Sequence, residues 1–560
     1  MEAYFGTMPA PQDTVGSYSS SSNGENFVTA TAPATMTPGP VSVLLTDANN
    51  NVVFLPDAFT YGPRILRVQP SAAGPAGGDS ITIFAYGLGF FDLSDIHVTI
   101  GGTAVDMQNA TLNSYVSNTF PEASVTIPVP PGTPGWADVQ ITTSNGTDTL
   151  KRGLQYLSAE TEITGGPFAF AVYDAVRNLF YLTGNGNTVS VFNPISQSMG
   201  QALTSSSVSS GATLQQEAIT PDGSKLLVVD PTDLAIIVFD LVAGASTKVN
   251  VALPSDPTNN TAQPTNVVAS ANNRAFVGVT PCLPLREIDL ANMTVQGRTD
   301  LSIGCAAAYT PYPEFGSASA DGSTIVYAAS NGTQFGLSPS GPEYVWRYNA
   351  SADSFSGPVI FHDRPWMLGV LPTVDGDGGM VGLPQGILDA QQLPKVNILS
   401  AEVIGAMNGT GSLMYGVGYE GSQIVLSDTH NGRGLLMLQA QNSQGTAIGA
   451  YQPLAIDATG TKILLALQSG LAYFDLDIVP LAVGTVTPVS AAPGATIQVR
   501  GSGFVAGTTV KIGGVSANCS LVDAETLSCA VPALRSGATS MSLSNPDGQT
   551  YSFENALVVP

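Results

Sequence analysis

One short pattern returns through the middle of the chain, from about residue 160 to about residue 480, and it restricts the possible folds more than any other feature. Each copy consists of an apolar strand, a tight polar turn, a second apolar strand, another turn and a third strand. The copies recur about every 40 to 55 residues, a period typical of the four-stranded blades of a β-propeller. Seven copies begin near Ala171, Glu217, Val267, Ala318, Thr373, Tyr415 and Leu454.

The pattern predicts a seven-bladed propeller over residues 158–480. The last copy supplies only three strands before a new type of segment begins near Val483. Glu160 to Thr164 precedes the first blade and is free to act as the fourth strand of the last one. Such closure removes the exposed sheet edges, so we expect these residues to pair with the last blade.

The amino-acid sequence of the copies resembles a known repeat family. The segment Pro221-Asp-Gly-Ser-Lys-Leu-Leu-Val-Val and the strand Asn187-Thr-Val-Ser-Val-Phe-Asn193 are similar to the YVTN propeller repeats of bacterial surface proteins. The resemblance covers a little over half of the chain and implies the fold rather than a function.

Two further segments, residues 63–157 and 481–560, share a different order of short alternating strands and Gly/Pro turns, which predicts antiparallel β-sandwiches. Ile81 to Phe90 is followed by Val98-Thr-Ile-Gly-Gly102, and Thr496 to Phe504 is followed by Val510-Lys-Ile-Gly-Gly514. Both segments resemble the immunoglobulin-like IPT/TIG domain. The expected fold class is therefore all-β, a seven-bladed β-propeller flanked by immunoglobulin-like β-sandwiches.

Residues 1–62 hold a third copy of the sandwich pattern that lacks its two opening strands, and we interpret them as a partial IPT/TIG-like sandwich. A sandwich without these strands leaves an unpaired strand edge and uncovered apolar side chains, which are costly in water. We expect Val41, Leu44 and Phe59 to form an assembly interface there.

The net charge of −24 in 560 residues disfavours binding to nucleic acid or to anionic membranes, since no Lys/Arg run could neutralise phosphates. The apolar residues are interrupted everywhere by Gly, Pro and polar residues, so we expect no membrane insertion. Four cysteines form two local pairs, and we expect disulfides Cys282–Cys305 and Cys519–Cys529. Disulfides persist in oxidising compartments, so the expected location is extracellular or at the cell surface, although the sequence shows no export signal.

Catalytic and metal patterns are sparse. The three histidines are His97, His362 and His430; the last two each lie near an aspartate, but isolated loop histidines are the more common situation. The segment Asp375-Gly-Asp-Gly-Gly379 superficially resembles a calcium loop, yet the distal glutamate is missing and its position matches the turn of Pro221-Asp-Gly. We interpret it as a turn, and we expect no enzyme activity, cofactor or metal.

The interpretation we favour is an extracellular structural or interaction protein that self-assembles head to tail into a homopolymer, as a filament or surface-layer subunit, through its terminal sandwiches. An adhesin or a carbohydrate- or peptide-binding propeller is the alternative, with a cell-surface glycan or another surface protein as partner. A propeller enzyme is a third possibility. Fold-level analogy carries much of this choice.

Overall fold

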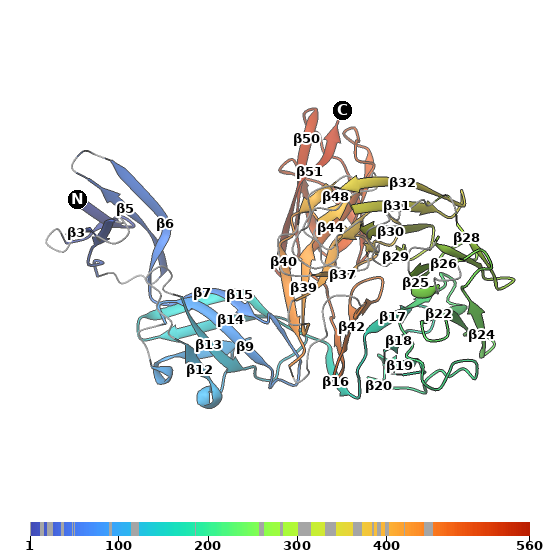
Figure 1. Cartoon of the computed structure of the whole chain (residues 1–560). Helices are drawn as coiled ribbons and strands as arrows, with labels where there is room; N and C mark the ends of the chain where they lie inside the picture. The colour runs from blue at the N-terminus through green and yellow to red at the C-terminus, as the bar shows by residue number, and fades with distance from the viewer. Residues whose placement is uncertain are drawn as a thin grey trace. The chain divides into compact units, whose positions relative to one another are not determined.

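The structure is a computed structural model in which the chain divides into two compact units, Met1–Ser158 and Ala159–Pro560, each described here by itself (Figure 1). The residues that it describes are 2–11, 16–19, 26–34, 39–47, 49, 51–88, 92–113, 122–184, 186–256, 262–280, 284–298, 300, 315–330, 343–361, 372–383, 386–388, 394–397, 403–418, 421–441 and 452–560.

Residues 63–156 form a sandwich of two sheets, in the orders β11-β10-β14-β15-β8 and β12-β13-β9-β7. Strand alternation explains the core: one face of each strand is apolar and buried, as at Ile81 and Ile83 in β9 and Val139 and Ile141 in β14. The elements are β7 (Arg64–Gln69), β8 (Ala72–Ala73), β9 (Ser80–Tyr86), η2 (Leu93–Asp95), β10 (His97–Ile100), β11 (Thr103–Ala104), η3 (Met107–Asn109), β12 (Thr111–Asn113), β13 (Glu122–Pro128), β14 (Gly135–Thr143) and β15 (Gly146–Tyr156).

The first part of the same unit repeats only some of this sandwich. Its four-stranded sheet has the order β2-β1-β5-β6, which corresponds strand for strand to β11-β10-β14-β15, and β3 pairs with β4 in a separate two-stranded sheet. Among the described residues of 2–61, no strands correspond to β7 and β9. The strands are β1 (Glu2–Phe5), β2 (Met8–Pro9), β3 (Gly16–Ser19), β4 (Asn26–Thr29), β5 (Gly39–Thr46) and β6 (Val52–Tyr61).

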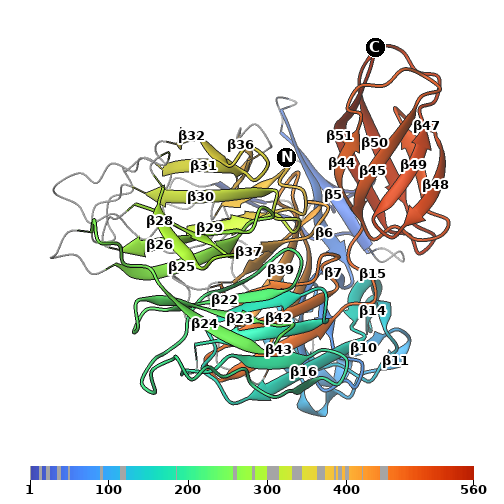
Figure 2. The same cartoon turned by 90° about the vertical axis from the view of Figure 1, so that its right-hand side faces the viewer.

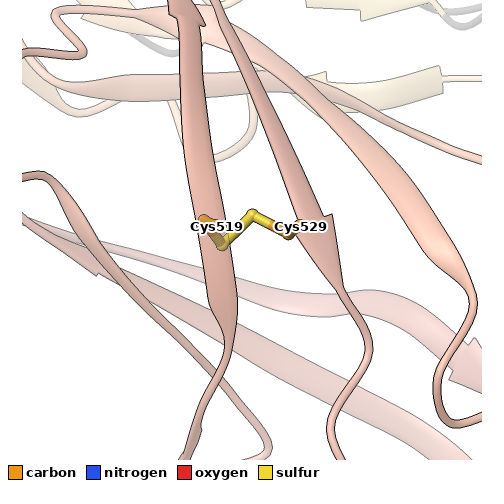
Figure 3. The surroundings of a disulfide bond; sticks show 2 residues. All are labelled: Cys519 and Cys529. Carbon is orange, nitrogen blue, oxygen red and sulfur yellow. A yellow bond between two sulfur atoms is a disulfide. The ribbon is translucent and has the colours of Figure 1, made fainter.

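The last segment of the chain forms a complete sandwich whose sheets have the orders β44-β45-β49-β48 and β47-β46-β50-β51. Cys519 in β48 lies directly opposite Cys529 in β49, and a disulfide joins them (Figure 3). The strands are β44 (Ala482–Thr487), β45 (Thr496–Ser502), β46 (Thr509–Ile512), β47 (Val515–Ser516), β48 (Asn518–Asp523), β49 (Thr526–Ala530), β50 (Gly537–Ser544) and β51 (Thr550–Val559). The predicted pair Cys282 and Cys305 lies outside the described residues.

The three sandwich segments share the same pairing register between their last two strands. Gly39, Gly135 and Gly537 each begin a long strand at a φ of 135°, 118° and 135°, a region that favours glycine. Each glycine pairs with a residue near the end of the following strand, and the register shifts at the same distance beyond it. The shifts lie between Val41 and Val43, between Ala137 and Val139, and between Thr539 and Met541.

The described residues between Ala159 and Asp475 form seven four-stranded antiparallel sheets, and Figure 2 shows several of them as successive sheets from green to orange. Six of the sheets are consecutive in sequence. They are β17 (Phe170–Asp174), β18 (Leu179–Thr183), β19 (Ser190–Asn193) and β20 (Ser198–Met199); β21 (Glu217–Ile219), β22 (Lys225–Asp230), β23 (Ala235–Asp240) and β24 (Ala245–Asn250); β25 (Gln263–Ala269), β26 (Arg274–Thr280), β27 (Arg286–Asp289) and β28 (Thr294–Gly297); β29 (Phe315–Ala318), β30 (Thr324–Ser330), β31 (Glu343–Asn349) and β32 (Ser354–Phe361); β33 (Thr373–Val374), β34 (Val381–Leu383), β35 (Gly386–Leu388) and β36 (Pro394–Asn397); and β37 (Val403–Met407), β38 (Leu413–Val417), β39 (Gln423–Asp428) and β40 (Gly434–Gln439).

The seventh sheet joins the two ends of this segment. Its order is β16-β43-β42-β41, with β16 (Ala159–Thr164) antiparallel to β43 (Gly470–Asp475), beside β42 (Lys462–Leu467) and β41 (Leu454–Ile456). The prediction that Glu160 to Thr164 supplies the fourth strand is confirmed. The first strands of the sheets contact one another in the order β17, β21, β25, β29, β33, β37, β41 and back to β17, so the sheets close into a ring.

The repeated turn glycine has a packing reason as well as a conformational one. In the turn between β21 and β22, Gly223 has a φ of 68°, and a Cβ atom there would lie 2.6 Å from Cγ2 of Val176 in the preceding sheet. Gly460, in the equivalent turn of the last sheet, has a φ of 76°, and a Cβ atom would overlap the hydroxyl of Tyr415. Glycine therefore lets each turn pack against the sheet before it.

The last sandwich is attached to the ring by buried polar contacts. The hydroxyl of Tyr551 in β51 donates to Oδ1 of Asp428, at the end of β39, over 3.1 Å, and both residues are buried. An exposed ion pair joins Arg500 to Asp377 over 3.1 Å. No helix among the described residues is long and apolar enough to cross a membrane.

Ring closure can be tested with two truncations that differ by six residues, 159–560 and 165–560. The longer protein keeps β16 and should unfold cooperatively, whereas the shorter one exposes the edge of β43 and should unfold at a lower temperature. Differential scanning calorimetry of both proteins checks this. Equal unfolding temperatures would contradict a closing role for β16.

The Cys519–Cys529 disulfide should stabilise the last sandwich mainly by restricting its unfolded state. For a loop of this length the chain-entropy model gives about 3 kcal/mol. Cys519→Ala with Cys529→Ala should therefore increase hydrogen exchange in β48 and β49, while exchange in β22 and β23 of the ring stays unchanged. Unaltered exchange in β48 and β49 would show that the bond contributes little.

Candidate functional sites

A cavity of about 300 Å³ lies at the axis of the ring, lined by residues from all seven first strands. Most of its wall is backbone and small side chains, such as Gly316 and Ala406. The polar side chains of the lining come from five of the sheets. These are Tyr173, Asp174, Gln216, Glu217, Thr220, Ser317, Ser319, Thr373, Gln452 and Asp457.

Glu217, the first residue of β21, is the most unusual group of this lining because only 2% of it is exposed. Burial raises the pKa of its carboxyl to about 8, with a hydrogen bond to Thr183 opposing the shift. Oγ1 of Thr183 lies 2.7 Å from the carbonyl oxygen of Gln215 and also 2.7 Å from Oε2 of Glu217. The hydroxyl of Thr183 therefore donates between two acceptors, the carbonyl oxygen of Gln215 and the carboxyl of Glu217.

The other carboxyl oxygen of Glu217 has no hydrogen-bond partner. Oε1 is buried and unpaired among the described residues. A buried acceptor without a donor costs about 1 to 3 kcal/mol. The lack of a donor at this atom therefore adds to the cost of burying Glu217.

Gln216, next in the wall, is held by groups from several sheets. Its Oε1 accepts from the backbone N–H of Val267 in β25 over 2.7 Å, and its Nε2 donates to the carbonyl of Glu217 over 2.8 Å. Nε2 also lies 3.5 Å from Oε1 of Gln452, which precedes β41. These contacts link the second, third and seventh sheets and fix the side chains at the axis.

The charge of the cavity wall is negative. Its described lining holds Asp174, Glu217 and Asp457 but no lysine, arginine or histidine. Asp174 is compensated by Arg177 over 2.9 Å, whereas Asp457 accepts hydrogen bonds from two threonine hydroxyls and a backbone N–H group. Burial, and to a lesser extent the negative charge of Asp457, raises the pKa of the Tyr173 hydroxyl to about 12. The charge of Asp457 therefore acts on groups that line the cavity.

The histidines do not form an acid–base pair in the described part of the chain. His430 is nearly buried, with its backbone N–H donating to Asp428 and its ring 4.1 Å from that of Phe553. It therefore packs where the ring meets the last sandwich. His97 is exposed in β10, and His362 lies outside the described residues.

The segment Asp375 to Gly379 forms the turn between β33 and β34, as predicted. Oδ1 of Asp375 accepts from the N–H of Met380, and Oδ1 of Asp377 accepts from the N–H of Gly379, each over 3.0 Å. Asp222 makes the same type of bond to the N–H of Ser224 in the turn after β21. Burial raises the pKa of the Asp375 carboxyl, and the nearby charge of Asp377 raises it further.

The predicted assembly residues lie in the incomplete sandwich of unit 1, on two different faces. Val41 and Phe59 pack around Ala3, Phe5 and Ala10 and are half-buried. Leu44 is absent from that cluster and lies on the opposite face of β5, because successive side chains alternate along a strand. The expected assembly interface of Val41, Leu44 and Phe59 therefore stays a prediction, and it involves both faces of the sheet.

Equivalent core positions in the three sandwich segments show how exposed the incomplete sheet is. Val43 corresponds by register to Val139 and Met541, which are both fully buried, yet Val43 is only half-buried. Phe59 shows the same difference from its counterparts in the two complete sandwiches. The missing counterparts of β7 and β9 account for this exposure.

The opposite face of the incomplete sheet is unusually apolar. Phe54, paired with Leu44, is 60% exposed, while the residues at the equivalent position are Thr149 and Ser552. Val52 on the same face is 58% exposed, and Val53 and Leu55, which alternate onto the face of Val43 and Leu45, are exposed at 52% and 43%. The last sandwich has its own exposed apolar residues on the edge strands β47 and β48, namely Val515, Leu521 and Val522.

Comparison with known proteins identifies the two complete sandwiches. The IPT/TIG domain family matches residues 63–156 and 481–558, whereas no curated protein matches the sequence. Similar solved structures include the hydrazine synthase of Kuenenia stuttgartiensis, with 14% identity, a TM-score of 0.41, and coverage of 57% of this chain and 98% of that one. Others are the Cps50 (Swd1) β-propeller domain of Myceliophteria thermophila, with 10% identity, a TM-score of 0.41 and coverage of 56% and 98%, and U3-55K, with 9% identity, a TM-score of 0.41 and coverage of 57% and 98%.

Sequence reasoning missed the axial site. Glu217 was recognised only as the start of a repeat, because its role depends on six other sheets that no local pattern specifies. One signal was available: a glutamate stands at the start of an otherwise apolar inner strand. Such a residue is seldom buried without a reason.

The protonation of Glu217 predicts how stability depends on pH. The pKa of Glu217 in the folded protein lies above the ordinary value of 4.5. The free energy of unfolding is therefore unaffected by this group below about pH 4.5, and it falls as the pH rises towards 8. Glu217→Gln removes this loss, and the variant should gain unfolding temperature over the wild type at pH 8 but not at pH 5. The exposed control Asp477→Asn should show no such trend; an equal difference at both pH values would show that Glu217 is not buried as a neutral acid.

Proposed function

We propose that this protein is a non-enzymatic, extracellular structural subunit that assembles head to tail through its terminal sandwiches. IPT/TIG domains and a propeller-like ring fit an interaction or structural protein. The disulfide Cys519–Cys529 suits an oxidising compartment. The observation that carries the proposal is the incomplete sandwich of residues 2–61, whose core positions are half-buried where those of the complete sandwiches are fully buried.

The partner surface we propose is the edge of the last sandwich in a second copy. Strand β48 is the outermost strand of its sheet, pairs on one side with β49, and exposes Leu521 and Val522 at 41% and 61%. In the incomplete sandwich, β4 corresponds to β49 and lacks the neighbour that β45 provides in the complete one. A strand of a second copy beside β4 would pair this edge and cover the half-buried face.

A contact between unlike ends of two copies is heterologous. It generates a ring if its rotation closes and an open helical filament if it does not. We infer a filament or surface layer, and we interpret the seven sheets as the blades of a YVTN-type propeller that spaces the two sandwiches. The exposed apolar residues at both ends support this polarity.

Deleting residues 1–62 tests the assembly directly. The shortened protein should remain monomeric in sedimentation velocity and show no filaments by electron microscopy, while the ring and the last sandwich stay folded. A truncated protein that still forms fibres would refute docking through the incomplete sandwich.

The partner surface needs its own variants. Val522→Asp should weaken association at least tenfold, because a charge would be buried at the apolar contact. Val242→Asp is the matched control, since Val242 is 78% exposed in a turn of the ring and belongs to neither proposed surface. If both variants assemble like the wild type, β48 is not the docking strand.

A further inference from the structure

We propose that the incomplete sandwich of residues 2–61 binds an extended segment of a partner polypeptide, in the place that β7 and β8 occupy in the sandwich of residues 63–156. The segment carries a β-branched apolar residue at its first position, valine at the fourth, proline at the sixth and alanine at the ninth. The contact uses the outer edge of β6, whereas the proposed assembly uses β4. This inference therefore does not depend on the assembly.

The first argument is that both complete sandwiches fill this place with the same kind of segment. Residues 65–73 read Ile-Leu-Arg-Val-Gln-Pro-Ser-Ala-Ala, and residues 483–491 read Val-Gly-Thr-Val-Thr-Pro-Val-Ser-Ala. Each segment begins with the same register shift against the strand that follows it, β9 or β45. The side chains at the first, fourth and ninth positions are buried in both segments. They are Ile65, Val68 and Ala73 in one, and Val483, Val486 and Ala491 in the other.

The second argument is backbone pairing, because the end of each segment runs parallel to the last strand of its sandwich. The backbone N–H of Gln155 donates to the carbonyl of Ser71 over 2.9 Å, and that of Val558 donates to the carbonyl of Val489 over 2.9 Å. Both donors correspond by register to Thr60 in β6. Strand β6 is the outermost strand of its sheet, and no strand among the described residues of 2–61 pairs with this edge. An extended segment can make the same backbone hydrogen bonds here.

The third argument is the apolar surface that the segment would cover. In the sandwich of residues 63–156, the buried side chains of β7 and β8 belong to one core cluster with Val139 and Ile141 of β14. The counterparts of these two residues in β5 are Val43 and Leu45, and both are only half-buried. A segment with apolar residues at the same positions would remove this surface from water.

The occupant must be an unpaired segment rather than the edge of a folded sandwich. Residues 65–73 and 483–491 are already paired within their own sandwiches. Strand β48, which we propose to dock beside β4, reads Asn-Cys-Ser-Leu-Val-Asp and lacks the proline and alanine of the pattern. The partner is therefore a polypeptide that presents a free segment of this pattern.

The experiment measures the binding of a fluorescein-labelled peptide with the sequence of residues 64–73 to the full chain, by fluorescence anisotropy. A peptide with the same residues in reverse order controls for composition, and a peptide with Ile65→Asp and Val68→Asp tests the buried positions. The expected result is one site per chain for the first peptide. Both control peptides should bind about tenfold more weakly or worse, because the aspartates would be buried without partners.

Protein variants locate the site. The chain that lacks residues 1–62 should not bind the peptide, and Val43→Asp should weaken binding about tenfold or more. The matched control Ile195→Asp, at a ring residue that is 79% exposed, should bind like the wild type. Sedimentation velocity of the same samples records the assembly state, so a failure of assembly and a failure of peptide binding are separate results.

Several outcomes overturn the proposal. Lack of binding, equal binding of the reversed peptide, or undiminished binding to the chain that lacks residues 1–62 each contradict it. The peptide substitutions leave the protein unchanged, so they remain decisive if Val43→Asp fails to fold. Binding seen only with the assembly variant Val522→Asp would show that a second copy of this chain fills the place, and it would exclude the partner that we propose.

Discussion

The pairing of β16 with β43 is the constraint on which unit 2 depends. It joins residues from before the first sheet to the last sheet, which turns a row of sheets into a ring. Without it, the outer edge of β43 would be unpaired and the seventh sheet would have three strands. The axial cavity depends on the same closure, since its wall needs first strands from every sheet and Gln452 reaches Gln216 only when the last sheet lies near the first two.

Much of this ring was predictable because its determinants are local. The turn glycines repeat, and the structure gives them a common reason in the close approach of one sheet to the next, as at Gly223 against Val176. The closing strand could also be predicted, since counting strands in the last repeat left a place for one. The sandwiches followed from strand alternation and from the Gly-Gly turns, and the register at Gly39, Gly135 and Gly537 extends the relation to the incomplete segment.

The sites were less predictable, because they depend on contacts between distant segments. The face of Leu44 illustrates this: apolar residues occur on both sides of β5, so composition alone could not assign it, and only the register places it beside Phe54. The environment of Glu217 involves Thr183, which ends a strand of the preceding sheet, and the sequence around Glu217 does not reveal this neighbour. A short strand with one acidic residue has many possible explanations until its neighbours are known.

The terminal sandwiches and the axial cavity of the ring differ in physical character. The terminal sandwiches offer exposed apolar surface, where association gains free energy by removing side chains such as Phe54 and Val522 from water. The axial cavity has the reverse character, because carboxyl-bearing residues line it and the side chain of Glu217 in its wall is almost wholly buried. None of the exposed apolar residues of the terminal sandwiches lines the axial cavity, so association through those residues would leave the cavity wall unchanged.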